Sequence, residues 1–261
     1  MQRRKFFKNT MILAAGTTLI NSALSAKENN SLMQNDPEFY EIFNYFSEVE
    51  VTKYNKLDKQ NTHLVKLAAI IANGGSLDFF KEYLNIALAQ NINPVAIKEL
   101  IYQSVPYLGF SKVYKFLELC NKIFKESNIS LPLKNQGTTT KENRYEEGLK
   151  LQVHIFKEAI LKGNEDTPED MKHIREFLSS NCFGDYYTRK GLDLKTRELL
   201  TFVFLASLGG CENQLKGHIQ GNFNMKNNRD ILISTLTQIC PFIGYPKTLN
   251  ALNLIEETSK K

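Results

Sequence analysis

Apolar residues recur every three or four positions along most of the chain, which places them on one face of an α-helix. Two apolar stretches, HLVKLAAIIANGG at 63–75 and RELLTFVFLASLGG at 197–210, end in a glycine pair, a typical C-terminal stop signal of a helix. No stretch of the sequence shows the strict alternation that indicates a β-strand. The pattern therefore predicts an all-α protein.

The helical pattern occurs twice. Residues 57–117 align with residues 192–252 at a constant offset of 135 and without a gap. The helix breakers match in register: Gly74 with Gly209, Pro106 with Pro241, and Gly109 with Gly244. Breakers that match in register are hard to obtain by chance, so we interpret the chain as an internal duplication.

A polar stretch rich in helix breakers, SNISLPLKNQGTTTKEN, separates the two copies. Within 144–180 the pattern adds one or two further helices. The sequence thus predicts four parts, which are a signal peptide at 1–26, a first domain at 27–127, a linker at 128–143 and a second domain at 144–261.

The first 26 residues are typical of an export signal. Basic residues precede MILAAGTTLINSAL, an apolar stretch shorter than the roughly 20 residues needed to span a bilayer. Small residues near Ser25 and Ala26 suit cleavage, and Arg3-Arg4 followed by two phenylalanines resembles the twin-arginine (Tat) consensus. We predict export to the periplasm, or otherwise out of the cytoplasm through the Tat pathway, with no membrane attachment after cleavage; the alternative is an uncleaved anchor or a cytoplasmic tail.

Charge and cysteine content narrow the possible partners. The formal net charge is +5, but the chain after residue 26 carries 29 basic and 28 acidic residues. This near-neutral charge lacks the excess of basic residues that is typical of nucleic-acid-binding proteins. The four cysteines are widely scattered and have neither the density of a disulfide framework nor the spacing of a zinc site. We therefore expect no nucleic-acid partner and no metal.

Candidate chemistry lies around the second glycine pair. If the helices before and after it run antiparallel, Glu198 faces Gly221 and lies within one turn of His218. Cys211, Gln214 and His218 fall at i, i+3 and i+7, which is one stripe of the second helix. This hairpin would place a carboxylate, an imidazole and a thiol at one seam.

Each group has a chemical and a structural interpretation. Cys211 would sit in the first helical turn, where unpaired N–H groups and the helix dipole stabilise a thiolate. Glu198 could hold the His218 imidazole in one tautomer, ready for proton transfer. Alternatively, the cysteine only packs, the histidine is an ordinary surface residue, and Glu198 lies on a solvated helix face. In the first copy the corresponding positions are His63, Ser76 and Tyr83, so either only the second copy works or both have drifted.

The stretch from LDLKTRELL to GYPKTLNAL resembles the carboxymuconolactone decarboxylase family, which includes γ-carboxymuconolactone decarboxylase and alkylhydroperoxidase D-like thiol enzymes. The resemblance covers about 185–255, and the first copy is similar but weaker. It implies an all-α fold of two tandem domains of this family, the first with a degenerate site. It also implies a ring of chains, for which we expect a homotrimer.

The resemblance carries over only part of the thiol chemistry. Alkylhydroperoxidase D-like members use a glutamate, a CxxC pair and a histidine, which Glu198, Cys211 and His218 match, whereas the second cysteine position holds Gln214. A peroxidase cycle would then need another resolving thiol, such as Cys240 or one from a partner chain. The decarboxylase branch performs acid–base chemistry on a small lactone acid without a cofactor, so the resemblance implies a small-molecule substrate and no cofactor.

Three functions follow from the sequence. The leading hypothesis is a cofactor-free, decarboxylase-like lyase acting on a small organic acid or lactone, with His218 as general acid/base, Glu198 as its orienter, and Cys211 and Gln214 contacting the substrate. The second is a thiol peroxidase or disulfide reductase with peroxiredoxin-type activity that uses Cys211. The third is a non-catalytic exported oligomer that binds a ligand.

Overall fold

The structure, a computed structural model, describes residues 31–260, so the signal peptide expected at 1–26 lies outside the described residues. Helices and turns make up this part of the chain, and no strand occurs within it. The all-α prediction is confirmed. None of the helices between residues 31 and 260 has the length and apolar character needed to cross a membrane.

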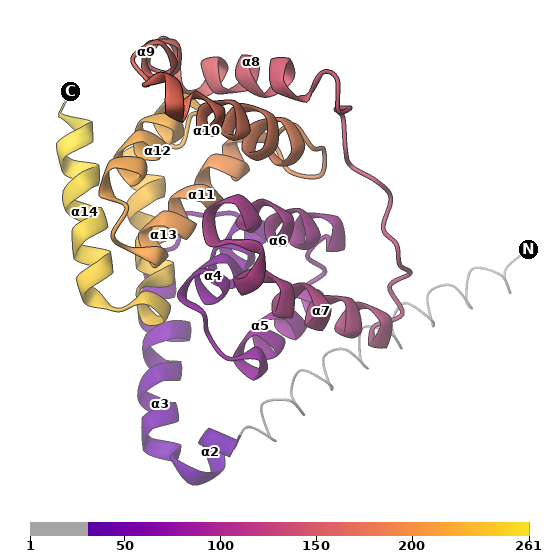
Figure 1. Cartoon of the computed structure of the whole chain (residues 1–261). Helices are drawn as coiled ribbons and strands as arrows, with labels where there is room; N and C mark the ends of the chain where they lie inside the picture. Colours follow the sequence, from indigo (N-terminus) through magenta and orange to yellow (C-terminus); the bar gives the residue numbers. More distant parts are fainter. Residues whose placement is uncertain (1–30, 261) are drawn as a thin grey trace, which may run out of the picture.

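The duplication is visible in the helix boundaries (Figure 1). The first copy forms four helices: α4 Lys59–Asn73, α5 Leu77–Ala89, α6 Pro94–Leu108 and α7 Phe110–Glu126. The second copy forms four more: α11 Leu194–Leu208, α12 Glu212–Asn224, α13 Arg229–Ile243 and α14 Tyr245–Ser259. Each helix of the second copy begins 135 residues after its counterpart, the same offset as in the sequence alignment.

Local side-chain chemistry sets these boundaries. Asp58 caps α4 by accepting the Asn61 N–H, and Asp193 caps α11 in the same way by accepting the Thr196 N–H. At the other ends, Gly74 and Gly209 adopt φ of 72° and 74°, a region that favours glycine. The helix stops expected from the glycine pairs are therefore confirmed.

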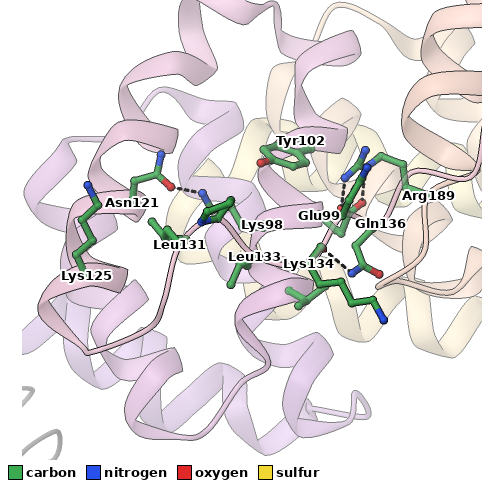
Figure 2. A pocket seen from close by; sticks show the side chains of 13 residues that line it. Lys98, Glu99, Tyr102, Asn121, Lys125, Leu131, Leu133, Lys134, Gln136 and Arg189 are labelled. Atoms are coloured by element: carbon green, nitrogen blue, oxygen red, sulfur yellow. Dashed lines mark hydrogen bonds and ion pairs between the residues drawn. The ribbon is translucent and has the colours of Figure 1, made fainter. Parts of the chain in front are cut away.

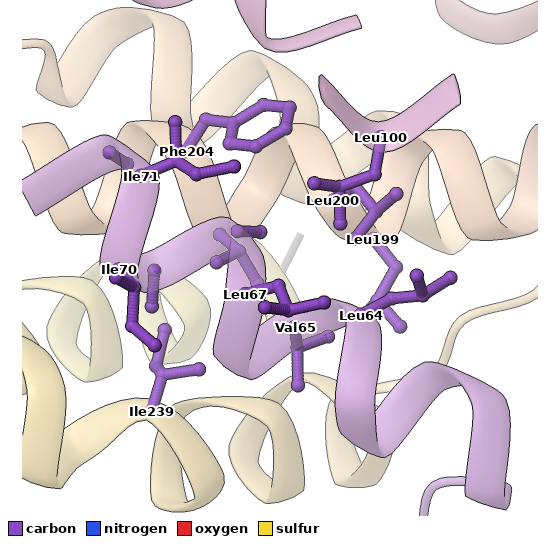
Figure 3. Close-up of a cluster of buried hydrophobic side chains, with 14 of the residues drawn as sticks. Leu64, Val65, Leu67, Ile70, Ile71, Leu100, Leu199, Leu200, Phe204 and Ile239 are labelled. Carbon is purple, nitrogen blue, oxygen red and sulfur yellow. The ribbon is translucent and has the colours of Figure 1, made fainter. Parts of the chain in front are cut away.

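One hydrophobic core joins the two copies. Helices α4 and α11 pack against each other at its centre, where Leu64, Leu67 and Ile71 lie beside Leu200 and Phe204 (Figure 3). All five side chains are almost completely buried, so the interface between the copies has the character of a protein interior rather than of a domain contact.

Each copy is preceded by an irregular helical arm. The first arm consists of α2 Ser31–Asn35, α3 Pro37–Tyr45, the π-helix η1 Phe46–Glu50 and the 3₁₀ turn η2 Val51–Tyr54. The second consists of α8 Arg144–Phe156, α9 Ala159–Glu165, η3 Glu169–Met171, α10 Lys172–Phe177 and the π-helix η4 Leu178–Tyr187. Residues 127–143 contain no helix and run from α7 to α8 (Figure 1).

The second arm is more broken than the one or two helices that its sequence pattern predicts. Helix α8 ends at Lys157, whose backbone takes a φ of 59°. Two glycines bring α8 against η4, since a Cβ on Gly148 would lie 1.9 Å from the Ser179 carbonyl oxygen, and one on Gly184 would lie 2.0 Å from that of Arg144. This close packing carries Tyr187, at the end of η4, toward α11.

Candidate active site

Helices α11 and α12 form an antiparallel hairpin around Gly209 and Gly210, both of which have positive φ. Glu198 is fully buried, and its Oε2 lies 2.9 Å from Nδ1 of His218, whose side chain is 12% exposed. The expected meeting of these two residues is therefore confirmed. A solvated face for Glu198 is wrong, because Glu198 and its neighbour Arg197 are both completely buried.

The helices approach closely enough for this contact because residue 221 is glycine. A Cβ there would lie 2.4 Å from Glu198 Oε2, 2.9 Å from Cε1 of Phe156 and 3.1 Å from a methyl group of Ile155. No side chain fits in that space, so Gly221 is a requirement of the carboxylate's position. The sequence-based expectation that Glu198 faces Gly221 is confirmed.

The second carboxylate oxygen is held by a tyrosine. Tyr187 donates its hydroxyl to Glu198 Oε1 at 2.9 Å and is also hydrogen-bonded to the Thr201 hydroxyl. Burial, together with the charge of Glu198, raises the pKa of Tyr187 well above its ordinary value. The phenol therefore stays protonated and keeps donating to the carboxylate.

Two aromatic rings enclose the imidazole of His218. Phe156, from α8, lies edge-to-face with it at 5.1 Å between ring centres, and Tyr107 does so at 5.8 Å. Tyr107 belongs to α6 of the first copy, so the site is completed across the duplication. Within the described part of the chain, His218 Nε2 has no hydrogen-bond partner, which leaves this nitrogen for a reactant.

A thiol does reach this cluster, but it is Cys182. Its Sγ lies 3.7 Å from the Tyr107 hydroxyl, and burial raises its pKa to about 12. Sequence reasoning missed Tyr107, Phe156, Tyr187 and Cys182 as members of the site. The only signal for them was indirect, because Tyr107 stands in the repeated PYLGF segment, and the other three lie outside the aligned repeat.

Cys211 occupies the N-cap of α12, with its Sγ 3.4 Å from the Leu205 carbonyl oxygen. Partial burial, followed by the charge of Glu212, raises the pKa of Cys211. The expected stabilisation of a thiolate is therefore wrong in direction. No hydrogen bond joins Cys211 to Glu198 or His218 in the described chain, and Gln214 is exposed.

A buried charge network anchors the start of α11. Arg197 donates to Glu99 Oε2 at 3.0 Å and to Gln103 Oε1 at 2.9 Å, and both partners lie on α6. It also donates to the carbonyl oxygen of Arg189 at 2.7 Å. Because Glu198 directly follows Arg197, this network fixes the height and rotation of the helix turn that presents the carboxylate.

The first copy carries a different set of charges at the equivalent place. Lys66, the counterpart of Thr201, lies 3.1 Å from Glu48, and Tyr83, the counterpart of His218, donates to the same carboxylate at 3.0 Å. The ring of Phe242 packs on Tyr83 at 5.1 Å, as Tyr107 packs on His218. His63 occupies the position in the first copy that corresponds to Glu198, and burial lowers the pKa of His63.

Residues 31–260 contain no group of three or more His, Cys, Asp or Glu side chains arranged to hold a metal ion.

Comparison with known proteins agrees with the duplication. The sequence model of the carboxymuconolactone decarboxylase family matches residues 37–122 and again residues 172–257. The chain belongs to the carboxymuconolactone decarboxylase family. Its two matched regions are 135 residues apart, so they coincide with the two copies, and Glu198 and His218 both lie in the second.

A curated relative supports the same assignment. The 4-carboxymuconolactone decarboxylase of Acinetobacter baylyi is 28% identical to this chain over 120 residues. The aligned region covers 46% of this chain and 89% of that protein. The relative thus corresponds in length to a single copy, whereas this chain holds two copies of the carboxymuconolactone decarboxylase domain.

Proposed function

We propose that the second copy is a cofactor-independent acid–base enzyme, a decarboxylase-like lyase that acts on a small organic acid or lactone. His218 exchanges the proton and Glu198 positions it. The observation that carries this proposal is the 2.9 Å contact between His218 Nδ1 and the buried Glu198 carboxylate, inside a cage of aromatic rings.

The geometry suits one proton transfer at a time. Glu198 already accepts a hydrogen bond from Tyr187, and as an acceptor it keeps a proton on His218 Nδ1. The lone pair of Nε2 can then take a proton from the substrate and return it later in the reaction. Apolar rings around the imidazole lower the local dielectric, which strengthens the pull of the carboxylate on the imidazolium ion.

The class of substrate rests on the relatives. By its name, the Acinetobacter protein acts on 4-carboxymuconolactone, and we carry over only its class, a small carboxylated lactone. Thiol-based peroxidase activity at Cys211 is less well supported, because its pKa is raised and residue 214 is glutamine rather than a second cysteine.

The decisive experiment compares His218→Gln with His173→Gln, a change at an exposed histidine of α10. With 4-carboxymuconolactone as the probe, we expect His218→Gln to lower kcat by roughly 10²–10⁴-fold, the usual contribution of a positioned acid/base. His173→Gln should match the unchanged protein. Activity of His218→Gln within a few-fold of the unchanged protein contradicts the proposal, and turnover of peroxide or disulfide in its place favours the thiol function. Binding of small ligands without turnover of any of these substrates favours the non-catalytic oligomer.

We infer that the protein assembles as a homotrimer. Support comes from apolar side chains that the single chain leaves exposed on its two arms, which are Phe39 and Ile42 on α3, and Ile174 and Phe177 on α10. Light scattering coupled to size-exclusion chromatography should give three times the chain mass, and a monomer mass contradicts this inference.

We also propose that the chain is exported through the Tat pathway, on the strength of Arg3, Arg4 and the short apolar stretch that follows them. Replacement of both arginines by lysine should retain the full-length chain in the cytoplasmic fraction. Unchanged fractionation contradicts the proposal.

A further inference from the structure

A cavity of about 530 Å³ lies between the first copy and the segments that follow it, and His218 is not among its lining residues. Its walls come from α6, α7, the segment 131–136 and the turn that carries Arg189 (Figure 2). Part of the lining is apolar, from Val95, Leu131 and Leu133. The rest is strongly basic, with Lys98, Lys125, Lys134 and Arg189 facing a single carboxylate, that of Glu99.

Lys98 is a buried cation without a counter-ion. Lys98 is only 6% exposed, and its amine donates a hydrogen bond to the side-chain oxygen of Asn121. In the described part of the chain, no carboxylate lies within ion-pair distance of this amine. Burial lowers the pKa of Lys98 accordingly. A buried charge is costly unless it is paired, so an anion beside Lys98 would offset this cost.

Glu99 does not supply the missing charge, because two arginines share it. Arg189 contacts Glu99 Oε1 at 2.9 Å and Arg197 contacts Oε2 at 3.0 Å. One negative charge thus faces two positive ones, and Lys98 adds a third. Glu99 therefore leaves the cavity lining with an excess of positive charge even before the exposed lysines are counted.

Tyr102 sets the shape of this basic surface. The amine of Lys98 lies 5.9 Å from the centre of the Tyr102 ring, and the guanidinium carbon of Arg189 lies 5.2 Å from it. Figure 2 shows the ring over the cavity, between these two cations. A ligand with anionic oxygens could reach both of them beside one aromatic face.

The walls are held in place by backbone contacts. The Lys190 N–H donates to the Gln136 carbonyl oxygen at 2.9 Å, which ties segment 131–136 to the turn before α11. That turn packs tightly on α6, since a Cβ on Gly191 would lie 2.8 Å from Val95 and 2.9 Å from the Glu99 side chain. The cavity is therefore part of the packed structure.

The α6 side of this cavity has no equivalent in the second copy. In α13, the counterparts of Lys98 and Tyr102 are Ile233 and Thr237, and the counterpart of Glu99 is Ser234. Lys98 is thus not part of the scaffold that the two copies share.

We propose that this cavity binds a small organic anion. Its carboxylate or phosphate oxygens accept hydrogen bonds from Lys98 and from the cavity-facing side of Arg189. Its apolar part lies against Leu131 and Leu133.

The test is calorimetric titration of the full chain with adipate, a dicarboxylate, and with phenyl phosphate, at constant ionic strength. We expect saturable binding of at least one probe, and the stronger of the two identifies carboxylate or phosphate as the preferred group. Lys98→Met should weaken binding by about tenfold or more. The matched control is Lys122→Met, which changes an exposed lysine of α7 outside the cavity and should leave binding unchanged.

A thermal measurement checks that Lys98→Met folds. Since methionine removes an unpaired buried charge, its Tm without ligand should equal or exceed that of the unchanged protein. The probe should raise the Tm of the unchanged protein but not that of the variant. Should Lys98→Met fail to fold, Lys134→Met, at an exposed position of the same lining, must weaken binding instead. Absence of saturable binding with both probes, or equal binding by the lysine variants and the control, overturns the proposal.

Discussion

The two halves of this protein share a helical scaffold and differ in what the scaffold presents. In the second half, the space between the paired helices holds Glu198 and His218. In the first half, the equivalent space holds Lys66, Glu48 and Tyr83, joined by an ion pair and a hydrogen bond. The polar group at this place can thus change in kind while the surrounding helices keep their lengths.

The helix caps show the same divergence on a smaller scale. Ser76 caps α5 by accepting the Phe79 N–H at 3.1 Å, whereas Cys211, at the equivalent position of α12, makes no capping hydrogen bond. The second half therefore gives up a stabilising contact where it carries the thiol. Such a cap is usually worth about 1 kcal/mol.

The largest effect should come from giving the second half a feature of the first. Gly221 corresponds to Ile86, so we predict that Gly221→Ile drives Glu198 away from His218 and lowers kcat by more than roughly 100-fold. Overpacking should also cost about 1–3 kcal/mol of stability. Steady-state kinetics and urea unfolding measure the two effects. Ile86→Gly is the reciprocal control, which should lose stability but not activity. Equal losses of activity in both variants would contradict the prediction that only the second half carries the active site.

The next effect concerns the buried charge network that joins Arg197 of the second half to Glu99 of the first and has no equivalent at Ser234. Glu99→Gln leaves Arg197 buried without its carboxylate, and breaking a buried pair typically costs about 3–5 kcal/mol. Its counterpart Ser234 makes two neutral hydrogen bonds, with Lys56 and Tyr54, so Ser234→Ala should cost only about 1–2 kcal/mol. Chemical denaturation of both variants measures the difference. Equal costs would mean that the network contributes no more than the hydrogen bonds that replace it.

A smaller effect is expected from the aromatic ring that each half packs against the polar group of the other half. Tyr107→Phe reproduces Phe242, keeps the ring on His218 and removes only the hydroxyl, which lies near Cys182, Thr201 and Tyr187. We predict a change in kcat of less than about tenfold and a stability loss of about 1 kcal/mol. Tyr107→Ala should impair catalysis far more, because it opens the apolar cage. If both variants lose activity equally, the hydroxyl takes part in the reaction itself.

The smallest effect concerns the reactivity of Cys211. Since its pKa is raised, its alkylation by iodoacetamide should be slow at neutral pH and accelerate only above about pH 8.5, the ordinary thiol value. Mass spectrometry of the modified peptide gives the rate at each pH, and Cys211→Ser is the control for labelling at the buried thiols. A midpoint well below that of an ordinary thiol would restore the redox function that we rank second.

The fold and the central pair of the site could be predicted from sequence because both depend on regular periodicity. The glycine pair fixes a hairpin, and antiparallel pairing then places Glu198 opposite Gly221 by counting residues alone. Tyr187, Phe156 and Cys182 could not be found in this way, since they come from α8 and the π-helix η4, which lie outside the repeat and whose packing on the hairpin cannot be counted from it. The thiolate expectation failed because the helix start is partly buried, and desolvation outweighs the helix dipole at Cys211.

The exchange of aromatic rings between the halves makes the surroundings of their two polar groups interdependent. Tyr107 of the first half packs on His218 of the second, and Phe242 of the second half packs on Tyr83 of the first. Each half thus supplies an aromatic ring that covers the polar group of the other. A substitution on α6 can therefore reach the imidazole on α12, so the half without the Glu–His pair forms part of the wall around that pair.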